Sequence, residues 1–410
     1  MRTYGRVRRS CFRIAAVISF GEHINAAPGA RVAVGMSGGV DSSVTALMLM
    51  EAGFEVCGVT CLFADDAHAH AAVHDARAVA ASLGIAHETR DCTQAFSCNV
   101  VDAFVDSYAR GLTPSPCVVC NKTCKIPSLI AAADDLGCDF VATGHYARVV
   151  SRAGRLAAAR AAYAPKDQSY MLSMLAQDQL ARLMLPLGSL REGKPEVRAI
   201  AARHGLAVAS KSDSQDICFI HGSHLDFLEE RGVVAHPGDI VDLQGRRVGR
   251  HAGLFRYTIG QRKGLDIGGA PEPYYVVAKR PEENELVVAF ARDAAIDGVV
   301  VGGVRWQGAS PDAAARLCAD GNAMPCAVKL RYRQQATACC IAPADAQGRA
   351  MPFAGRSDVR REAGLIAAML DAPQPTTAPG QFAVFYDDDV VMCAGVIEQV
   401  VRCADRSHRA

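Results

Sequence analysis

The chain lacks several features that would place it in a simple class. No stretch is long and apolar enough to span a bilayer, which argues against a membrane protein. Its 44 basic and 43 acidic residues nearly cancel, leaving a net charge of +1. Nucleic-acid binding would therefore have to come from local basic patches and not from bulk charge. No internal repeat is present, which excludes a repeat architecture.

A clear secretory signal is also missing, and this changes how the 16 cysteines are interpreted. In a short secreted chain they would indicate a disulfide framework. In 410 residues without such a signal they favour thiols that serve catalysis, redox chemistry or metal binding. The arginine-rich extension 1–30 is compatible with an organelle presequence, a misassigned start or a disordered tail. We expect disorder there and exclude the extension from the fold.

Beyond this extension, short apolar runs alternate with stretches of helical spacing. RVAVG, FEVCGVTCL and CDFVAT are strand-like runs, and glycines such as Gly53 and Gly84 end the helical stretches between them. The alternation predicts an α/β fold with a doubly wound parallel sheet over 31–215. Ligands of such sheets bind at the carboxyl ends of the strands. Both GMSGGVDS (35–42) and TGHY (143–146) fall at such ends.

The alternation stops near residue 216. Short runs broken by glycine and aspartate predict a small central module over 216–288. Further β-type runs predict a C-terminal β-barrel over 289–410, with a hairpin turn at the three aspartates 387–389. The segment 345–372, rich in Ala, Arg and Pro, predicts an inserted loop with one short helix.

The stretch GMSGGVDS differs from the common nucleotide loops, because it has neither the GKS or GKT ending of a Walker A loop nor the GxGxxG spacing. Its glycines allow the backbone to approach a charged group, and the following helix offers unpaired N–H groups and its positive dipole end. Ser37, Ser42 and Ser43 add hydroxyl donors. The loop predicts a phosphate or pyrophosphate site, and Asp41, which alone would repel phosphate, predicts a bound Mg²⁺. A plain strand-to-helix turn is the alternative.

SGGVDSS resembles the PP-loop of the ATP pyrophosphatases, which cleave ATP to AMP and pyrophosphate and adenylate a substrate oxygen. Several substrate classes share that loop. Cysteines narrow the choice: Cys117, Cys120 and Cys124 lie in GLTPSPCVVCNKTCK, and Cys218 lies in KSDSQDICFI. Thiolates can carry sulfane sulfur as a persulfide. ATP activation with two thiols predicts sulfur insertion, in which one thiol delivers sulfur and the other resolves the intermediate as a disulfide.

The order of the motifs is similar to that of the tRNA-specific 2-thiouridylase family over about residues 31–401. The motifs are GMSGGVDSSV, DARAVAASLGI, GLTPSPCVVCNK, ATGHYAR, KDQSYML, KSDSQDICFI, YTIGQRKGL, LRYRQ and PGQFAVFY. The resemblance implies ATP-dependent 2-thiolation of the wobble uridine of tRNAs for Lys, Glu and Gln, through adenylation of O2. It implies ATP and Mg²⁺ as cofactors, tRNA as partner, and a sulfur-relay protein or cysteine desulfurase as persulfide donor. It also implies a cytoplasmic protein with no membrane partner.

The resemblance assigns roles to individual residues as well. Cys120 would be the nucleophile and Cys218 the persulfide carrier, and the two would form a disulfide during turnover. The residues implied for ATP are Gly35, Met36, Ser37, Gly38, Gly39, Val40, Asp41, Ser42, Cys61 and Gly144. Those implied beside the target base are Ser115, Pro116 and Cys117. Those implied for other tRNA contacts are His145, Lys166, Asp167, Gln168, Arg331, Tyr332 and Gln381.

Physical reasoning agrees with part of this assignment. A stacked base must be extruded before its atoms can be modified, and the rigid prolines 114 and 116 suit a pocket wall. In KLRYR, strand alternation would place Lys329, Arg331 and Arg333 on one face that can meet phosphates. A solvated barrel face is the alternative. At position 117 the family has either Asp or Cys, and with Cys117 here no carboxylate is available there as a general acid or base.

Two alternatives use the same cysteines differently. Cys117, Cys120 and Cys218 could hold an iron–sulfur cluster whose open iron carries hydrosulfide. Cys117, Cys120 and Cys124 could instead hold a structural zinc in a non-catalytic tRNA-binding protein. The tract DDAHAHAAVHD, with His68, His70 and His74, resembles a metal-binding tract. We interpret it as a polar loop that enters a helix, and we assign no metal ligands in the chain.

Overall fold

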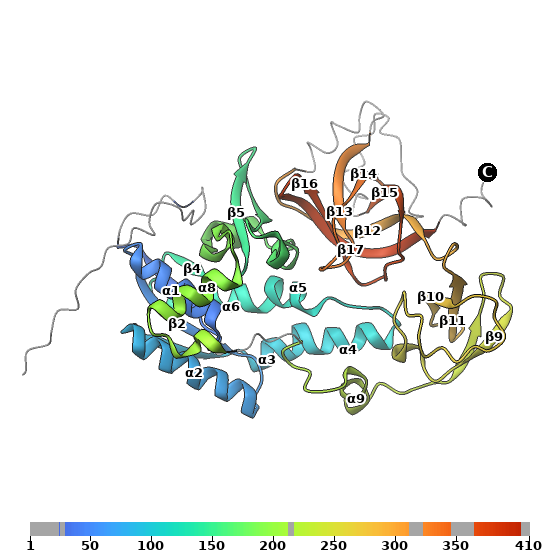
Figure 1. Cartoon of the computed structure of the whole chain (residues 1–410), viewed down its shortest axis with the longest axis horizontal. Coiled ribbons are helices and arrows are strands. Elements are labelled where there is room, and N and C mark those ends of the chain that lie inside the picture. The colour runs from blue at the N-terminus through green and yellow to red at the C-terminus, as the bar shows by residue number, and fades with distance from the viewer. Residues whose placement is uncertain (1–23, 25–28, 212–216, 311–322, 346–364, 403–410) are drawn as a thin grey trace, which may run out of the picture.

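The computed structural model describes residues 24, 29–211, 217–310, 323–345 and 365–402. The expected disorder of 1–30 falls almost wholly outside these residues, as do positions 212–216 of the KSDSQDICFI motif. Figure 1 shows an α/β unit on one side and a β-barrel and a small β module on the other. Within the described residues, no helix has both the length and the apolar character needed to cross a membrane.

The α/β unit is built on five parallel strands, in the order β3-β2-β1-β4-β7. Their bounds are β1 Arg31–Gly35, β2 Glu55–Leu62, β3 His87–Asp91, β4 Phe140–Ala142 and β7 Leu183–Met184. Because β1 lies at the centre and the chain crosses to both sides of it, the carboxyl ends of β1 and β4 are neighbours. The predicted doubly wound parallel sheet is confirmed, and the two motifs that follow β1 and β4 meet at one edge.

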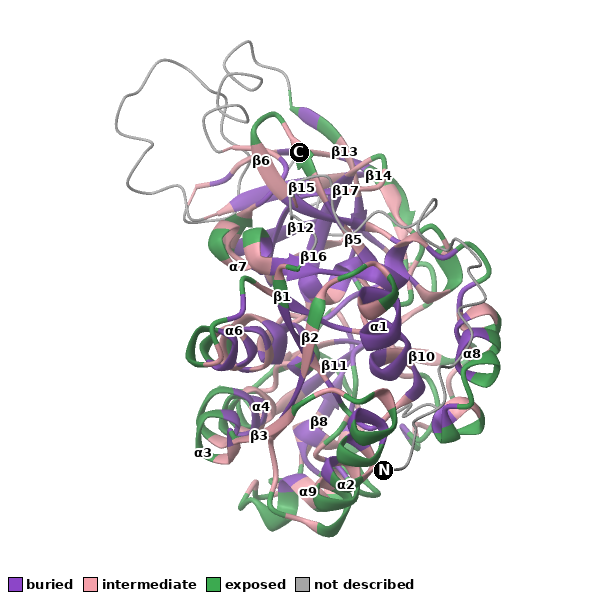
Figure 2. Cartoon of the chain, turned by 90° about the vertical axis from the view of Figure 1, so that its left-hand side faces the viewer, coloured by how far each residue is buried: buried purple, intermediate pink, exposed green. Residues whose placement is uncertain are grey.

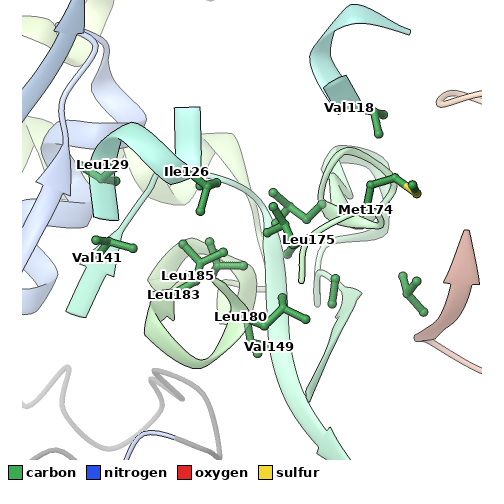
Figure 3. Packing of buried hydrophobic residues seen from close by; sticks show 14 of the residues in the cluster. Val118, Ile126, Leu129, Val141, Val149, Met174, Leu175, Leu180, Leu183 and Leu185 are labelled. Atoms are coloured by element: carbon green, nitrogen blue, oxygen red, sulfur yellow. The ribbon is translucent and has the colours of Figure 1, made fainter. Parts of the chain in front are cut away.

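Helices cover both faces of this sheet, as Figure 2 shows by the buried residues along the strands. Val32 and Val34 pack in one core with α1 (Val40–Glu51), α2 (Ala67–Leu83) and α8 (Lys194–Arg203). Ala33 packs on the opposite face with α6 (Ile126–Asp135), because successive strand side chains point to opposite faces. Figure 3 shows this second core, where Ile126 and Leu129 of α6 lie near Val141 of β4.

The central module is a four-stranded sheet in the order β10-β11-β8-β9. Its strands are β8 Gly238–Val241, β9 Arg247–His251, β10 Tyr274–Arg280 and β11 Glu285–Phe290. The C-terminal strands form a closed antiparallel barrel, since β12 pairs with both β15 and β17. They are β12 Ile296–Trp306, β13 Met324–Lys329, β14 Thr337–Pro343, β15 Ile366–Gln374, β16 Phe382–Asp387 and β17 Val390–Arg402. The predicted barrel and central module are therefore confirmed.

A hairpin from the α/β unit extends the barrel sheet. Strands β5 (Ala147–Arg152) and β6 (Arg155–Arg160) join it through the pair Val390 and Ala159. Arg148 pairs with Asp389 and Arg152 with Asp387, across the tight turn between β16 and β17. The predicted turn at 387–389 is confirmed, and its aspartates attach the barrel to the first unit. The boundaries 31–215, 216–288 and 289–410 stay predictions.

Two local predictions were wrong. The segment 345–372 was expected to be a loop with a short helix, but Ile366–Gln374 is strand β15; residues 346–364 lie outside the described part. Pairing with β12 and β14 on its two sides outweighs the helix propensity of its alanines. The basic stripe along KLRYR fails because β13 ends at Lys329, so Arg331 and Arg333 lie in the turn that follows.

Candidate functional site

The phosphate loop connects β1 to α1 and keeps the helix N-terminus open. Gly39 is the N-cap of α1, and no side chain caps it. The Oγ of Ser42 accepts a hydrogen bond from the amide of Ser37 (3.2 Å), and the Oγ of Ser43 donates to the carbonyl of Gly39 (2.8 Å). These hydroxyls therefore brace the loop. Amides of a first helical turn have no partner within the helix, so they can bind an anion at this end.

Two glycines allow the close packing around this loop. Gly38 has a φ of +66°, and a Cβ there would lie 2.7 Å from the carbonyl oxygen of Ala72 in α2. A Cβ at Gly144 would lie 3.0 Å from the backbone nitrogen of Ser42. The TGHY turn after β4 thus packs directly on the loop after β1. The remaining residues implied for ATP contribute the end of β1 (Gly35), a buried side chain (Met36), the first residue of α1 (Val40) and a position in β2 (Cys61).

Asp41 is held by two groups that the sequence did not single out. The hydroxyl of Tyr146 donates to its Oδ1 (2.7 Å), and the Nζ of Lys194 contacts its Oδ2 (2.7 Å). A second lysine, Lys211, donates to the carbonyl of Gly38 (3.0 Å). Both cations lie beside the open helix end, where they favour a bound anion. Because both oxygens of Asp41 already have partners, a Mg²⁺ there would have to replace one of them.

The first two thiols lie on a helix that begins immediately after the proline-rich loop. Ser115 is the N-cap and Pro116 the first residue of α5 (Pro116–Cys120), where proline suits the helix start. Cys117 and Cys120 are three residues apart and so lie on one face. A π-helical turn, Asn121–Lys125, then connects α5 to α6. Such turns occur often at functional sites.

Aromatic packing places Cys218 next to this helix. Its neighbour Phe219 has its ring 5.6 Å from that of Phe96. Phe96 belongs to the same buried cluster as Cys120 and Cys124, with Phe219 packed against it. The segment that carries Cys218 therefore lies against the helix that carries Cys120, almost a hundred positions earlier in the chain.

The electrostatics of Cys218 agree with this placement. Burial is the largest cause that raises the pKa of Cys218 to about 11; Lys125 acts against it, and Cys120 and Cys117 add smaller upward effects. Burial also raises the pKa values of Cys117 and Cys120. All three are free thiols in this structure. The disulfide between Cys120 and Cys218 stays a prediction for turnover.

Lys125 is a site residue that sequence reasoning missed. Its charge lowers the pKa values of Cys117, Cys120 and Cys218, against the larger effect of burial. It also acts on His145, whose pKa falls to about 3, first through burial and then through Lys125. Lys125 is therefore near both the thiols and the TGHY turn. The only available signal was a lysine five residues after Cys120 in CNKTCK.

The residues implied for the target base include one firm link to the barrel. Ser115 donates from Oγ to the Oε1 of Gln381 (3.2 Å), and the Nε2 of Gln381 donates to the carbonyl of Thr113 (2.9 Å). Pro116 is buried, whereas Cys117 reaches the surface. The barrel residue Gln381 thus fixes the loop in front of the thiols.

Other residues implied for tRNA have their side chains engaged within the protein. Asp167 is buried and its Oδ2 accepts from the Nζ of Lys329 (3.0 Å). Arg331 donates to the carbonyls of Thr376 (2.7 Å) and Ile259 (3.3 Å), which joins the barrel to the central module. These contacts give both residues a bracing role, and their direct contact with tRNA stays a prediction.

The remaining residues of that set are Gln168, which contacts the TGHY turn, Lys166 and Tyr332. Gln168 accepts from the amide of Tyr146 at its Oε1 (2.9 Å) and donates from its own amide to the carbonyl of Tyr146 (2.7 Å). Lys166 is two residues before it and partly buried. The ring of Tyr332 lies 6.0 Å from that of Tyr170. Structure thus brings the 166–168 segment to the turn that packs on the phosphate loop.

The cysteines do not form a ready zinc site. Four ligands at Zn–S distances of about 2.3 Å would lie roughly 3.8 Å apart. Among the residues that the structure describes, the one group of three or more possible ligands within 4.8 Å of one another is Asp66, His68 and His221. Zinc at Cys117, Cys120 and Cys124 is therefore not supported. Cysteines around an iron–sulfur cluster are more widely spaced, so that alternative needs an experiment.

Comparisons with known proteins find three family models along the chain. Family models match residues 30–222 (tRNA methyl transferase HUP domain), 225–290 (tRNA methyl transferase PRC-barrel domain) and 347–397 (aminomethyltransferase beta-barrel domain). The chain is 40% identical over 381 residues to a tRNA-specific 2-thiouridylase MnmA of Lachnoclostridium phytofermentans, which covers 90% of this chain and 99% of that relative. It is 42% identical over 385 residues to the Rhodospirillum centenum protein of the same name, covering 90% and 91%.

Similarity to solved structures is much weaker. The U34-tRNA thiolase NcsA from Methanococcus maripaludis, solved with its 4Fe-4S cluster, is 18% identical and aligns with 49% of this chain and 64% of that one. Its TM-score of 0.32 is too low to support an inference.

Proposed function

Because the chain belongs to the tRNA-specific 2-thiouridylase family, we propose that it is a tRNA-uridine 2-sulfurtransferase that uses ATP to thiolate the wobble uridine at C2. The single observation that carries this proposal is the convergence of the Cys218 segment with Cys120, through the packing of Phe219 against the cluster of Phe96 and Cys120. Lys125 ends the π-helical turn that follows Cys120. Lys125 acts on His145 as well, and the neighbouring Gly144 packs on Asp41 and Ser42 of the phosphate loop. The thiols and the anion site therefore belong to one centre.

ATP fits the loop between β1 and α1. The open N-terminus of α1 suits phosphate, and Lys194 and Lys211 add positive charge beside it. When bound, ATP supplies the adenylyl group that converts the uracil O2 into a leaving group. Mg²⁺ would be held by Asp41, with Lys194 released toward the phosphates. Two of the family models are named after tRNA methyl transferases, but a pair of thiols suits sulfur transfer and not methyl transfer. The 2-thiouridylase name of the relatives agrees with the thiols.

The two cysteines divide the sulfur chemistry between them. Cys218 would carry the terminal sulfur as a persulfide, which bonds to C2 as the activated oxygen leaves. The Cys120 thiolate then attacks the Sγ of Cys218 and forms the disulfide, and the terminal sulfur stays on the base with the electrons of the broken S–S bond. A thiol reductant resets the pair. Burial raises the pKa values of both thiols, and Lys125 is the cation that lowers them and so favours the thiolate.

Partners and substrates follow from the same scheme. A sulfur-relay protein or cysteine desulfurase must load Cys218, which reaches the surface although the surrounding protein desolvates its thiol. The substrates would be the tRNAs for Lys, Glu and Gln, with the extruded base between the 115–117 segment and the phosphate loop. We expect the protein to work in the cytoplasm.

The decisive variants are Cys120→Ser and Cys218→Ser. Each should abolish thiolation of a wobble-uridine tRNA, measured by mass spectrometry of the nucleosides, because each removes one of the two reacting sulfurs. Pyrophosphate release from ATP in the presence of tRNA should persist in both, since the phosphate loop is intact. Thiolation at the wild-type rate in either variant would overturn the assignment.

Cys117→Ser separates the persulfide mechanism from the iron–sulfur alternative. That alternative is retained because Cys117 lies on the same helix as Cys120, and the Cys218 segment packs against that helix. A persulfide mechanism needs two thiols, so the variant should keep thiolation within a few-fold of wild type. Loss of thiolation, together with loss of bound iron and of visible absorption after anaerobic purification, would instead establish a cluster at Cys117, Cys120 and Cys218.

A further inference from the structure

A second group of chemically active side chains lies outside the site described above. Asp66, His68 and His221 each present one possible ligand atom, and these three atoms all lie within 4.8 Å of one another. Asp66 and His68 belong to the start of α2, whereas His221 comes three residues after Cys218. The sequence placed His68 in a histidine-rich tract but gave no sign that a histidine some 150 positions later completes it.

The geometry of the group suits a tetrahedral ion. At metal–ligand distances of about 2.0–2.1 Å, neighbouring ligands of tetrahedral zinc lie roughly 3.3 Å apart. The Nε2 of His221 and the Oδ2 of Asp66 are already 3.3 Å apart. The rings of His68 and His221 are stacked, with centroids 4.6 Å apart and an interplanar angle of 19°. The third ligand atom, a ring nitrogen of His68, lies within 4.8 Å of the other two and would have to move closer when an ion binds.

Asp66 is oriented for this role by the helix it caps. Its side chain accepts a hydrogen bond from the amide of Ala69 at Oδ1 (2.8 Å), which leaves Oδ2 facing His221. Outer hydrogen bonds of this kind fix the ligands of metal sites. The other histidines of the tract are engaged elsewhere: His70 contacts Asp65 (2.7 Å) and His74 contacts Asp75 (3.6 Å).

We propose that Asp66, His68 and His221 bind a divalent transition-metal ion, with zinc as the best fit to two imidazoles and a carboxylate. Water would take the fourth position, since the two histidines are exposed. The ion would fasten the segment 217–221 to the N-terminus of α2. Together with Phe219, which packs against Phe96, it would hold the Cys218 segment at two points. The proposal does not depend on the reaction at Cys218.

Cobalt is the probe that tests the site on the full chain. After treatment with a chelator, the protein should bind Co²⁺ with the visible bands of tetrahedral nitrogen and oxygen coordination, and Zn²⁺ should displace it. The His221→Gln variant should lose one bound ion per chain, with an affinity at least about tenfold lower, since even outer-shell changes cost that much. The difference spectrum should lack the near-ultraviolet charge-transfer band of thiolate ligands.

Two further variants keep the test sharp. Asp66→Asn should also lose the ion while still capping α2, because Asn and Asp are equivalent N-caps. His74→Gln, a change at an exposed histidine of the same helix, should bind Co²⁺ as wild type does. Equal binding by wild type and His221→Gln, or a His221-dependent ion with thiolate bands, would overturn the proposal.

Discussion

The phosphate loop and the thiol pair are built in opposite ways. The loop is braced by hydrogen bonds between residues close in sequence, Ser37 with Ser42 and Ser43 with Gly39, and Gly38 and Gly144 fit it tightly to its neighbours. The thiol pair is assembled from segments almost a hundred positions apart and depends on a few aromatic contacts of Phe219. A site built locally is recognisable as a motif and is rigid. A site built by convergence can change its geometry during a reaction that needs its sulfurs first apart and then bonded.

The largest effect is expected from a substitution in the rigid phosphate loop. Gly38→Ala should abolish ATP binding, because its left-handed backbone costs roughly 1–2 kcal/mol for alanine and its Cβ would lie 2.7 Å from the carbonyl oxygen of Ala72. Gly39→Ala is the matched control: its φ is −100° and its Cβ would meet only the Oγ of Ser37, at 3.4 Å. Calorimetric titration with ATP measures both. Equal affinities for the two variants would contradict the rigid-loop account.

The second largest effect is expected from a substitution that weakens the contacts holding the two thiols together. Phe219→Ala removes ring contacts at 5.6, 5.4 and 5.5 Å to Phe96, Phe104 and Phe227. Such pairs are worth about 0.5–1.5 kcal/mol each. The fraction of molecules in which the Cys218 segment has left its position beside Cys120 should therefore rise at least about tenfold. Single-turnover thiolation should slow accordingly, while tRNA-dependent pyrophosphate release stays unchanged. A parallel loss of both rates would show instead that the variant disturbs the whole centre.

A smaller effect is expected from removing the positive charge of Lys125 near the thiols. Lys125 lowers the pKa values of Cys120 and Cys218, so Lys125→Met should raise both and reduce the thiolate fraction at pH 7. Thiolation should fall several-fold at pH 7 and recover as pH rises, because each unit of pKa is a factor of ten in thiolate below that pKa. Lys125→Arg keeps the charge and should restore the neutral-pH rate. An unchanged pH–rate profile in Lys125→Met would contradict the role of Lys125 in lowering the pKa values of the thiols.

Sequence reasoning succeeded where the signal is local. Apolar runs ending in GMSGGVDS and TGHY predicted the parallel sheet and the position of these two loops at its carboxyl edge, because strand and loop patterns are short-range. It failed where tertiary contacts decide. Lys329 was assigned to a basic surface stripe, yet it is buried against Asp167, and β15 was mistaken for a loop. Lys125, Lys194 and His221 carry no motif of their own and gain their roles only when distant segments meet.

The contact between the α/β unit and the barrel could not be predicted from the sequence for the same reason. Asp387 and Asp389 were correctly placed in a turn, but nothing in their sequence names Arg152 and Arg148 as partners more than 200 positions away. Beside that contact, β6 pairs with β17 through Ala159 and Val390. Local patterns therefore define the elements, and their long-range partners must come from structure.

The most direct test of the account is the bond between its two sulfurs. The enzyme, loaded with persulfide, would be given ATP and a wobble-uridine tRNA for one turnover without reductant, then alkylated, digested and analysed by mass spectrometry. The account predicts a peptide pair joined through Cys120 and Cys218, in proportion to the thiolated uridine formed. Thiolated tRNA with both cysteines alkylated as free thiols would contradict it.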